Sequence, residues 1–270
     1  LIFILLLSWG SGTPAAEEFP LEVYFAGVSM IGDGSQNEIR YPVASRIWKE
    51  KTQTGSNLLD ETLNQILVGF ESPYLDLNFR DIQQKVDNTG SAEYTAFSFA
   101  LTDESVESNR WEDGYIYVYR VIAQILVFDF GDKMVIANYP VMVMLTDQGN
   151  HLRDEGEHAE IFRRIYLDPD YHVNIFKTWS ETLRVQKIKR EYGNYCRVRN
   201  VEVSDRAKEH IPARLLENNA FQSQTAQIFE FILSAEHGVP LIPYTKGQAV
   251  GSSMCARFAD ASACSKLGLN

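Results

Sequence analysis

The sequence predicts an α/β (α+β) fold, in which helices pack on a mixed or antiparallel sheet that contains a long β-hairpin. Residues 21–31 are rich in strand formers, and residues 57–70 repeat apolar side chains at helical spacing. Two long runs of strand formers, 115–130 and 133–145, flank a Gly-Asp dipeptide. The chain has 270 residues, 45% hydrophobic and 23% charged, which is enough apolar material for a packed core.

The first strand is predicted over Leu21–Ile31, because strand formers dominate this run and Gly- and Ser-rich turn residues follow it. Gly27 and Ser29 are small residues inside it. We interpret them as positions on which another backbone or side chain packs closely. The alternative is that Ser29 is a nucleophile at the end of a strand, but its spacing does not match a nucleophile elbow.

An amphipathic helix is predicted next, over residues 57–70. Asn57 stands three residues before Asp60, which is a helix-start signal. The apolar positions that follow at helical spacing are Leu59, Leu63, Ile66, Leu67 and Phe70. Ser72-Pro73 ends the helix, and the alternating residues 74–79 predict a short strand.

The clearest feature of the sequence is the hairpin, which follows a strand predicted over residues 93–102. Its arms, 115–130 and 133–145, meet at Gly131-Asp132, and a glycine at the first turn position is typical of a type II′ turn. Because Pro140 cannot donate to a ladder, we expect the second arm to lie at a sheet edge or to bulge there.

Two helices are predicted after the hairpin, over residues 156–166 and 173–190. The second carries an apolar stripe and basic residues near its end, where positive charge suits the helix dipole. Gly193 is expected to close it.

From Cys196 the strand–helix–strand pattern restarts. A strand is predicted over 196–203, and a short strand interrupted by prolines over 239–244. The helix between them ends near Gly238. Its expected apolar face comprises Phe221, Thr225, Ile228, Phe229, Ile232 and Leu233. The chain therefore reads as a strand–helix–strand unit twice, and the Gly-, Ser- and Ala-rich residues 246–270 are expected to be loosely ordered.

This pattern predicts four segments. They are a partial signal peptide (1–16), a first α/β domain with the long hairpin (17–150), a helical connection packed on it (151–195), and a second, truncated strand–helix–strand unit (196–270).

The apolar run Leu1–Leu7, followed by small residues and then by two glutamates, is typical of the back half of a secretory signal peptide. We expect cleavage near Ala16 and an exported mature chain; a buried N-terminal strand is the alternative. No other segment reaches the roughly 18 to 20 apolar residues that span a bilayer, so no transmembrane segment is expected in the mature chain.

Charge and cysteine content narrow the classes of partner. With 25 Lys and Arg against 36 Asp and Glu, the net charge is −11, which argues against nucleic acid as a partner. None of the three cysteines has CxxC spacing, which argues against a zinc site or a redox pair. Cys255 and Cys264 are the pair that closes most easily, leaving Cys196 free or bonded between chains.

The candidate partner-binding residues are tyrosines and basic residues. Tyr115, Tyr117 and Tyr119 share one face of the predicted strand, where they form either an interface platform or a layer packed under a helix. Lys187 and Arg190 belong to a local positive stretch, which is either a solvated helix end or a surface that docks an acidic partner or a second copy.

The candidate metal ligands are His151, Glu155 and His158, which would share one face of a helix at positions i, i+4 and i+7. A solvated connection is the competing interpretation, because the segment is strongly polar and contains Gly156. No catalytic residue and no cofactor are predicted, since no Ser or Cys stands in an activation motif and the other histidines are scattered.

The order of elements resembles the exported α/β modules of bacterial envelope-assembly proteins such as the curli-secretion protein CsgG and the N-terminal domain of TolB. The segments that carry the resemblance are Leu21–Ile31, Asn57–Phe70, Leu75–Phe79 and Tyr115–Leu145. It implies a non-enzymatic docking module exported from a Gram-negative cell, periplasmic or secreted, with a protein partner in the cell envelope or a second copy of itself. A secreted hydrolase or metal-dependent enzyme is the alternative function.

Overall fold

The computed structural model describes residues 20–31, 37–79, 94–129, 135–188, 196, 198–211, 213–216, 220–237, 244, 248–251 and 255–257. Its strands are β1 (Leu21–Ile31), β2 (Leu75–Asn78), β3 (Thr95–Trp111), β4 (Gly114–Asp129), β5 (Val135–Gly149), β6 (Gln248–Gly251) and β7 (Cys255–Arg257). Its helices are α1 (Asn37–Arg40), α2 (Pro42–Lys49), α3 (Leu58–Leu67), α5 (Glu155–Leu167), α6 (Ile175–Val185), α7 (Asp205–Lys208), α8 (Ala213–Leu216) and α9 (Ala220–His237).

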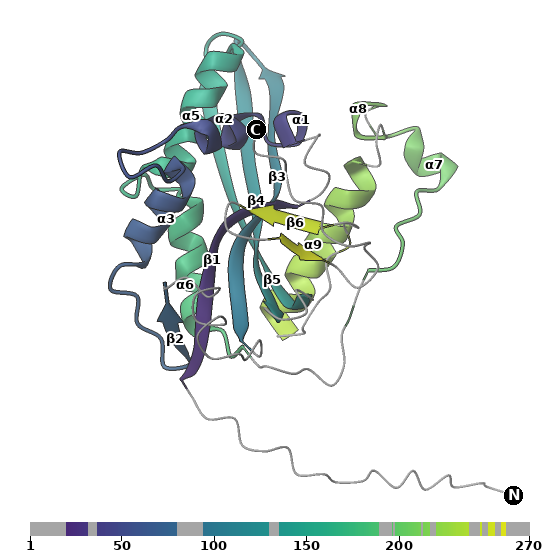
Figure 1. Cartoon of the computed structure of the whole chain (residues 1–270). Helices are drawn as coiled ribbons and strands as arrows, with labels where there is room; N and C mark the ends of the chain where they lie inside the picture. Colours follow the sequence, from purple (N-terminus) through teal and green to yellow (C-terminus); the bar gives the residue numbers. More distant parts are fainter. Residues whose placement is uncertain are drawn as a thin grey trace, which may run out of the picture.

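The described strands form one mixed sheet with the order β5-β4-β3-β1-β6-β7, and β2 also pairs with β1. β1 is parallel to β2 and β3, whereas the other pairs are antiparallel. Helices α3, α5 and α6 lie on one side of the strands and α9 on the other (Figure 1). The predicted α/β class is confirmed, and so is the placement of the hairpin, the first strand and the helix of residues 57–70 in one packed body.

The predicted hairpin is confirmed as β4 and β5, which pair from Tyr115 opposite Gly149 to Phe128 opposite Val135. The turn at Gly131-Asp132 lies outside the described residues. In the part of the chain that the structure describes, β5 is the last strand on its side of the sheet. Pro140 therefore lies on an edge strand, as a residue without an amide hydrogen requires.

The predicted strand at 93–102 is too short, because β3 continues to Trp111. Its outer half, residues 103–110, is mostly polar and has no alternating apolar pattern. The ladder to β4 nevertheless continues through it to the pair Trp111–Gly114, so β3 and β4 form a second hairpin. Glu112 in the two-residue turn has a φ of 49°, and tight hairpin turns require such a positive φ.

The helix predictions are right in position and wrong at several ends. Asn57 caps α3 as expected, since its side-chain oxygen accepts a hydrogen bond from the Asp60 amide at 2.9 Å. α3 ends at Leu67, because Val68 is extended and Gly69 has φ +76°. α5 matches the prediction within one residue at each end, whereas α6 ends at Val185. The chain is already extended at Gln186, and Gly193 lies outside the described residues.

The predicted repeat is wrong at its first strand, because residues 198–203 form no strand. The prediction of loose order after residue 246 is also wrong for β6 and β7, since β6 pairs antiparallel with β1 from Ser29 opposite Gly251 to Ile31 opposite Ala249. The strand expected at 239–244 lies outside the described residues except for Tyr244. The division of the chain into domains stays a prediction.

The expected apolar face of α9 does not turn wholly to the core. Ala226, Gln227 and Glu230 are buried, whereas Ile228, Phe229 and Ile232 are 44%, 56% and 41% exposed. The helix packs on β5, so its small and polar side turns inward. No helix among the described residues is both long enough and apolar enough to cross a membrane.

β1 changes the phase of its side-chain alternation at Gly27. Val23 belongs to the main core, and the register of β1 with β3 shifts between Phe25 and Val28. Because a β-bulge adds one residue, Val28 and Met30 also point into the main core, although they differ from Val23 by odd numbers of residues.

A second bulge, in β3, turns Glu104 toward the helices. The register with β4 shifts between Leu101 and Asp103. Glu104 is 7% exposed, and its carboxylate accepts hydrogen bonds from the amides of Val43 and Ala44 at 2.7 and 2.9 Å. It also accepts one from the Tyr166 hydroxyl at 2.9 Å. A residue of β3 therefore caps α2, whose own N-cap residue makes no side-chain cap bond, and ties it to α5.

Burial raises the pKa of Glu104, and it raises the pKa of Tyr166 well above its usual range. The three donors oppose the shift of Glu104 because they favour its charged form. We infer that this network stabilises the fold.

Glu104→Gln should lower the free energy of unfolding by about 1–3 kcal/mol, because the amide turns a donor toward the three donors and leaves at least one unpaired. Urea denaturation at neutral pH measures this loss. Glu107→Gln is the matched control on the same strand: its carboxylate is 37% exposed and pairs with Arg120, so its loss should stay below about 1 kcal/mol. Equal losses in the two variants would contradict the capping role of Glu104.

Candidate functional site

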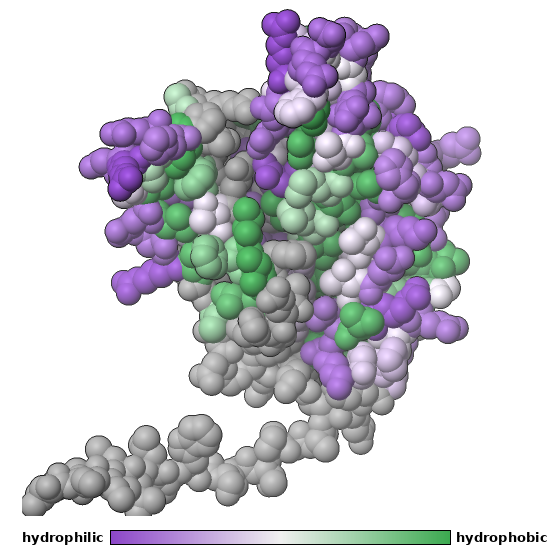
Figure 2. Space-filling model, turned by 180° about the vertical axis from the view of Figure 1, so that it is seen from behind, coloured by the Kyte–Doolittle hydropathy of each residue, from purple (hydrophilic) through white to green (hydrophobic). Residues whose placement is uncertain are grey.

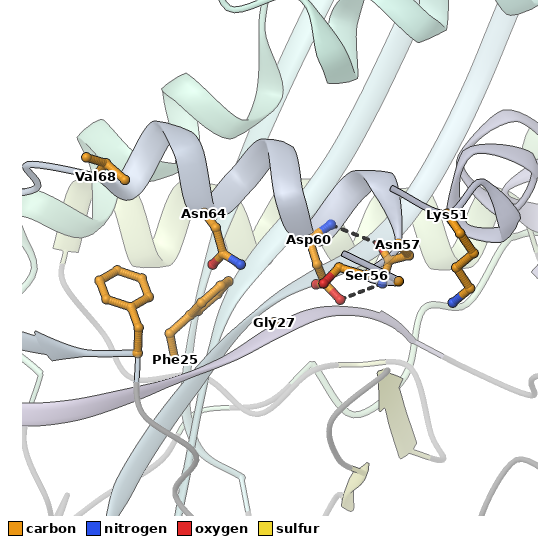
Figure 3. Close-up of a pocket in the computed structure, with 10 residues that line it drawn as sticks. Phe25, Gly27, Lys51, Ser56, Asn57, Asp60, Asn64 and Val68 are labelled. Atoms are coloured by element: carbon orange, nitrogen blue, oxygen red, sulfur yellow. Dashed lines mark hydrogen bonds between the residues drawn. The ribbon is translucent and has the colours of Figure 1, made fainter. Parts of the chain in front are cut away.

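A groove lies between α3 and β1, with a volume of about 500 Å³. Figure 3 shows the side chains of α3 pointing from one wall toward β1, with Lys51 at one end and Val68 at the other. Its lining residues are Phe25, Gly27, Lys51, Gly55, Ser56, Asn57, Asp60, Asn64, Val68 and Phe79.

The wall of the groove is fixed to its floor by Asp60. The Val28 amide donates a hydrogen bond to Asp60 Oδ1 at 2.6 Å, and the Asn57 side-chain amide donates to Asp60 Oδ2 at 2.5 Å. A carboxylate on the first turn of α3 thus accepts the amide next to the β1 bulge. Both carboxylate oxygens already have donors, so Asp60 holds the groove in shape.

Gly27 lets the strand and the carboxylate approach each other. Its φ is +84°, and a Cβ atom at this position would lie 2.9 Å from Asp60 Oδ1. The interpretation of Gly27 as a site of close packing is therefore confirmed. Ser29 is buried within the sheet, where its hydroxyl lies 3.2 Å from both Ser98 Oγ and the Phe99 carbonyl oxygen. That burial is unsuited to a nucleophile.

The apolar end of the groove is formed by Phe25, Phe79 and Val68. The rings of Phe25 and Phe79 meet edge to face with centroids 6.1 Å apart. Phe25 also contacts Trp179 in the core behind it. Phe79 is 50% exposed and Val68 is 80% exposed, so this end offers apolar surface to a ligand.

The polar end is formed by Lys51 and Ser56, and Asn64 lies between the two ends (Figure 3). A bridge between Lys51 and Asn57 closes a short loop, in which Gly55 has φ +85°. No carboxylate among the described residues pairs with the Lys51 ammonium, and the exposed Asn64 amide likewise has no hydrogen-bond partner within the described chain. These groups can bind a ligand without breaking an existing bond.

The floor of the groove coincides with a gap in the edge of the sheet. On the side of β1 away from β3, β2 pairs with residues 21–24 and β6 pairs with residues 29–31. Among the described residues, no strand pairs with residues 25–28 on that side. Asp60 takes the Val28 amide in this gap, where a neighbouring strand would otherwise supply an acceptor.

The three candidate tyrosines lie on one face of β4, and α5 covers two of them. Tyr117 and Tyr119 are fully buried, and the rings of Tyr119 and Phe162 meet edge to face at 5.4 Å. Tyr117 and Tyr119 therefore form a layer packed under a helix. They are not accessible as an interface platform. Tyr115 is half-buried and stacks on Tyr117 at 6.2 Å.

Arg153 joins the buried tyrosines to the start of α5. Its Nη1 donates to the Tyr119 hydroxyl at 3.0 Å, and its Nη2 lies 2.7 Å from Asp147 Oδ2. The Tyr119 hydroxyl lies 2.8 Å from His158 Nδ1. Because the hydroxyl already accepts from Arg153, its hydrogen is free to be donated to a neutral His158. Burial, followed by the Arg153 charge, lowers the pKa of His158.

The candidate metal ligands do not form one set. α5 begins at Glu155, so His151 lies before the helix and the assumed helical spacing is wrong. His151 Nε2 lies 2.9 Å from Glu157 Oε1, while His158 contacts Tyr119. The described part of the chain contains no group of three His, Cys, Asp or Glu residues placed to hold a metal ion.

The remaining candidates lie apart from the groove lining. The Lys187 ammonium lies over the Tyr74 ring at 4.9 Å, and Arg190 is outside the described residues. Cys196 is free and exposed. Cys264 is also outside the described residues, so its pairing with Cys255 stays a prediction.

The groove cannot be recognised in the sequence. Asn57 and Asp60 form only a helix-start signal there, and Lys51, Asn64 and Phe79 belong to no motif. The usable signal was Gly27, because a glycine inside a strand often marks a bulge or a close approach. Placing Asp60 against it required the packing of α3 on β1.

No protein-family model and no curated protein matches this sequence. Among solved structures, a neuraminyllactose-binding hemagglutinin homolog from Helicobacter pylori has 8% identity and a TM-score of 0.31, covering 70% of this chain and 88% of its own. A minor lipoprotein from Acinetobacter baumannii has 7% identity and a TM-score of 0.27, with 61% and 90% covered. A lipoprotein from Neisseria meningitidis has 10% identity and a TM-score of 0.18, with 54% and 95% covered.

Gly27→Ala should lower the free energy of unfolding by about 1–3 kcal/mol more than Gly55→Ala. The two glycines have φ +84° and +85°, but only at Gly27 would the new methyl group meet a side chain, Asp60. The difference between the two variants in urea denaturation therefore isolates the contact between β1 and α3. If Gly55→Ala is as destabilised as Gly27→Ala, the contact with Asp60 is not the cause.

Stability should depend on pH through His158. Its pKa is lower in the folded chain than its usual value of 6.5, so the unfolded chain binds this proton more readily. The contribution of His158 is therefore present above about pH 6.5 and is lost as the pH falls through the lower, folded value. Between about pH 7.5 and 5, the native chain should lose more unfolding free energy than His158→Gln. His210→Gln, at an exposed histidine, should keep the native slope; identical slopes in all three proteins would refute the assignment.

Proposed function

We propose that this chain is a non-enzymatic, exported binding protein that works in bacterial envelope or surface-organelle assembly, as the resemblance to CsgG-like and TolB N-terminal modules implies. The observation that carries the proposal is the composition of the groove. Among the described residues, Lys51 and Asn64 have no partner and can bind a ligand, while the carboxylate that lines the groove, Asp60, is held by two hydrogen bonds.

Three buried groups whose pKa values are raised lie outside the groove. Burial raises the pKa values of Tyr41, Glu104 and Tyr166, but all three are buried and hydrogen-bonded within the fold. A catalytic site would be expected to combine a displaced pKa with an accessible pocket. Their separation in this chain favours a binding role for the groove.

Exposed apolar side chains add to the surface that a protein partner can contact. Figure 2 shows apolar side chains at the surface among hydrophilic ones on the back of the molecule. On α9, Ile228, Phe229 and Ile232 are exposed, and on the edge strand β5 Met144 is 50% exposed. Uncovered apolar groups and strand edges are features of docking surfaces.

Export is supported by the apolar run Leu1–Leu7 and the small residues after it. Expression of the complete reading frame in a Gram-negative host should place a chain that begins near Glu17 in the periplasm. A photo-cross-linking amino acid at Phe79 should then capture a defined envelope protein, identified by mass spectrometry. The same group at Lys208, exposed on α7, is the control and should not capture that protein. Either of two results would overturn the proposal: the uncleaved chain stays in the cytoplasm, or the cross-linker captures no partner and leaves only the monomer.

A further inference from the structure

We propose that the outer half of β5, residues 140–148, pairs antiparallel with the same segment of a second copy of this chain, centred on Met144, so that two sheets join into one. This surface is separate from the groove between α3 and β1, and the inference does not rest on the proposed function.

The end of β5 shows which of its backbone groups face away from β4. The Gln148 amide donates a hydrogen bond to Asp147 Oδ1 at 2.8 Å, and the Gln148 carbonyl oxygen accepts one from Arg153 Nη2 at 3.3 Å. Neither partner belongs to β4, so both backbone groups of Gln148 are directed outward from the sheet. These two bonds also close the edge at this end.

Pro140 indicates the same outward series of residues. A proline in an edge strand lacks the amide hydrogen that would otherwise point away from the sheet. The register of β5 with β4 has no shift between Pro140 and Gln148, and inward and outward backbone groups alternate along an antiparallel strand. Met142, Met144 and Thr146 therefore also direct their amide hydrogens and carbonyl oxygens outward.

The outward groups of Met142, Met144 and Thr146 form an open strand edge. Within the part of the chain that the structure describes, β5 has no neighbouring strand on this side, and no other group bonds to these outward amides and carbonyls. Such an edge is a template on which another strand can pair.

The symmetry of the open edge favours a second copy of this chain as the occupant. Pro140 and Gln148 limit the edge four positions before and four positions after Met144. When two β5 strands lie antiparallel with Met144 opposite Met144, Met142 of each copy faces Thr146 of the other. Every outward amide hydrogen in this stretch then meets an outward carbonyl oxygen, as an interface between identical surfaces requires.

The side chains at the edge suit the same pairing. α9 also packs on β5, yet Met144 is 50% exposed and Thr146 is exposed. Both lie on the face opposite Val143 and Leu145, which belong to the main core. In the pair, the two Met144 side chains become direct cross-strand neighbours and remove apolar surface from water.

Charge does not oppose the pairing, although the chain has a net charge of −11. Asp147 is the only charged residue in the sequence of β5, and its carboxylate already lies 2.7 Å from Arg153 Nη2. With Met144 at the centre, Asp147 faces Val141 of the second copy. No two acids of β5 are therefore opposed, and the edge lacks the charges that commonly prevent strands from pairing.

Sedimentation velocity of the mature chain over a range of concentrations tests the assignment. The native chain should form a dimer as its concentration rises. Met144→Lys places two like charges opposite each other at the centre of the pair, so the dissociation constant should rise about fivefold or more. Asn109→Lys adds the same charge at an exposed position on β3, away from the edge, and should leave the dissociation constant unchanged.

A charge swap tests the register, because position 142 of one copy faces position 146 of the other. The double variant Met142→Lys/Thr146→Lys places like charges opposite each other twice and should dissociate most readily. Met142→Glu/Thr146→Lys places opposite charges at the same two points and should retain the dimer.

Three results would overturn the inference. They are a native chain that stays monomeric at every concentration, a dimer that Met144→Lys leaves intact, and equal dissociation constants for the two double variants. Circular dichroism spectra and urea midpoints show whether each variant remains folded. A monomeric chain that still captures an envelope protein from Phe79 would retain the proposed function and lose only this dimer.

Discussion

The hydrogen bond from the Val28 amide to Asp60 is the contact on which β1 and its surroundings depend. The bulge in β1 would by itself leave the buried Val28 amide unpaired, at a cost of about 1–3 kcal/mol. Asp60 supplies the missing acceptor from α3. The bulge can therefore persist, and it brings Val28 and Met30 into the same core as Val23. One interaction thus sets the phase of the strand, docks the helix and leaves the groove between them.

The neighbouring strand β3 also has a bulge beside a carboxylate that pairs with backbone amides, in this case Glu104. Its bulge turns a carboxylate toward α2 and α5, where it accepts hydrogen bonds from the Val43 and Ala44 amides of α2 and from the Tyr166 hydroxyl. Tyr41 adds a further link, since its hydroxyl donates to the Ile31 carbonyl at 2.7 Å and lies 3.2 Å from the Thr102 carbonyl. The helices are held to the sheet by these polar contacts as well as by apolar packing, which fixes their position along the strands.

The elements that could be predicted from the sequence are those encoded by local periodicity. β1, α3 and the β4–β5 hairpin carry their own alternation, caps or helical spacing, and the structure confirms them. The outer half of β3 is polar and is a strand because β4 pairs with it. Residues 198–203 look like a strand but have no partner to pair with in the described chain. The groove could not be predicted, because Gly27, Asp60 and Lys51 are brought together only by the packing of α3 on β1.

The same contact that stabilises β1 limits what the groove can bind. Both Asp60 oxygens accept hydrogen bonds from the chain itself, and residues 26–28 of β1 are buried. The floor of the groove therefore offers a ligand few polar groups. Most of the binding free energy has to come from the side chains at the two ends, where Lys51 carries a charge and Phe79 exposes half of its apolar surface.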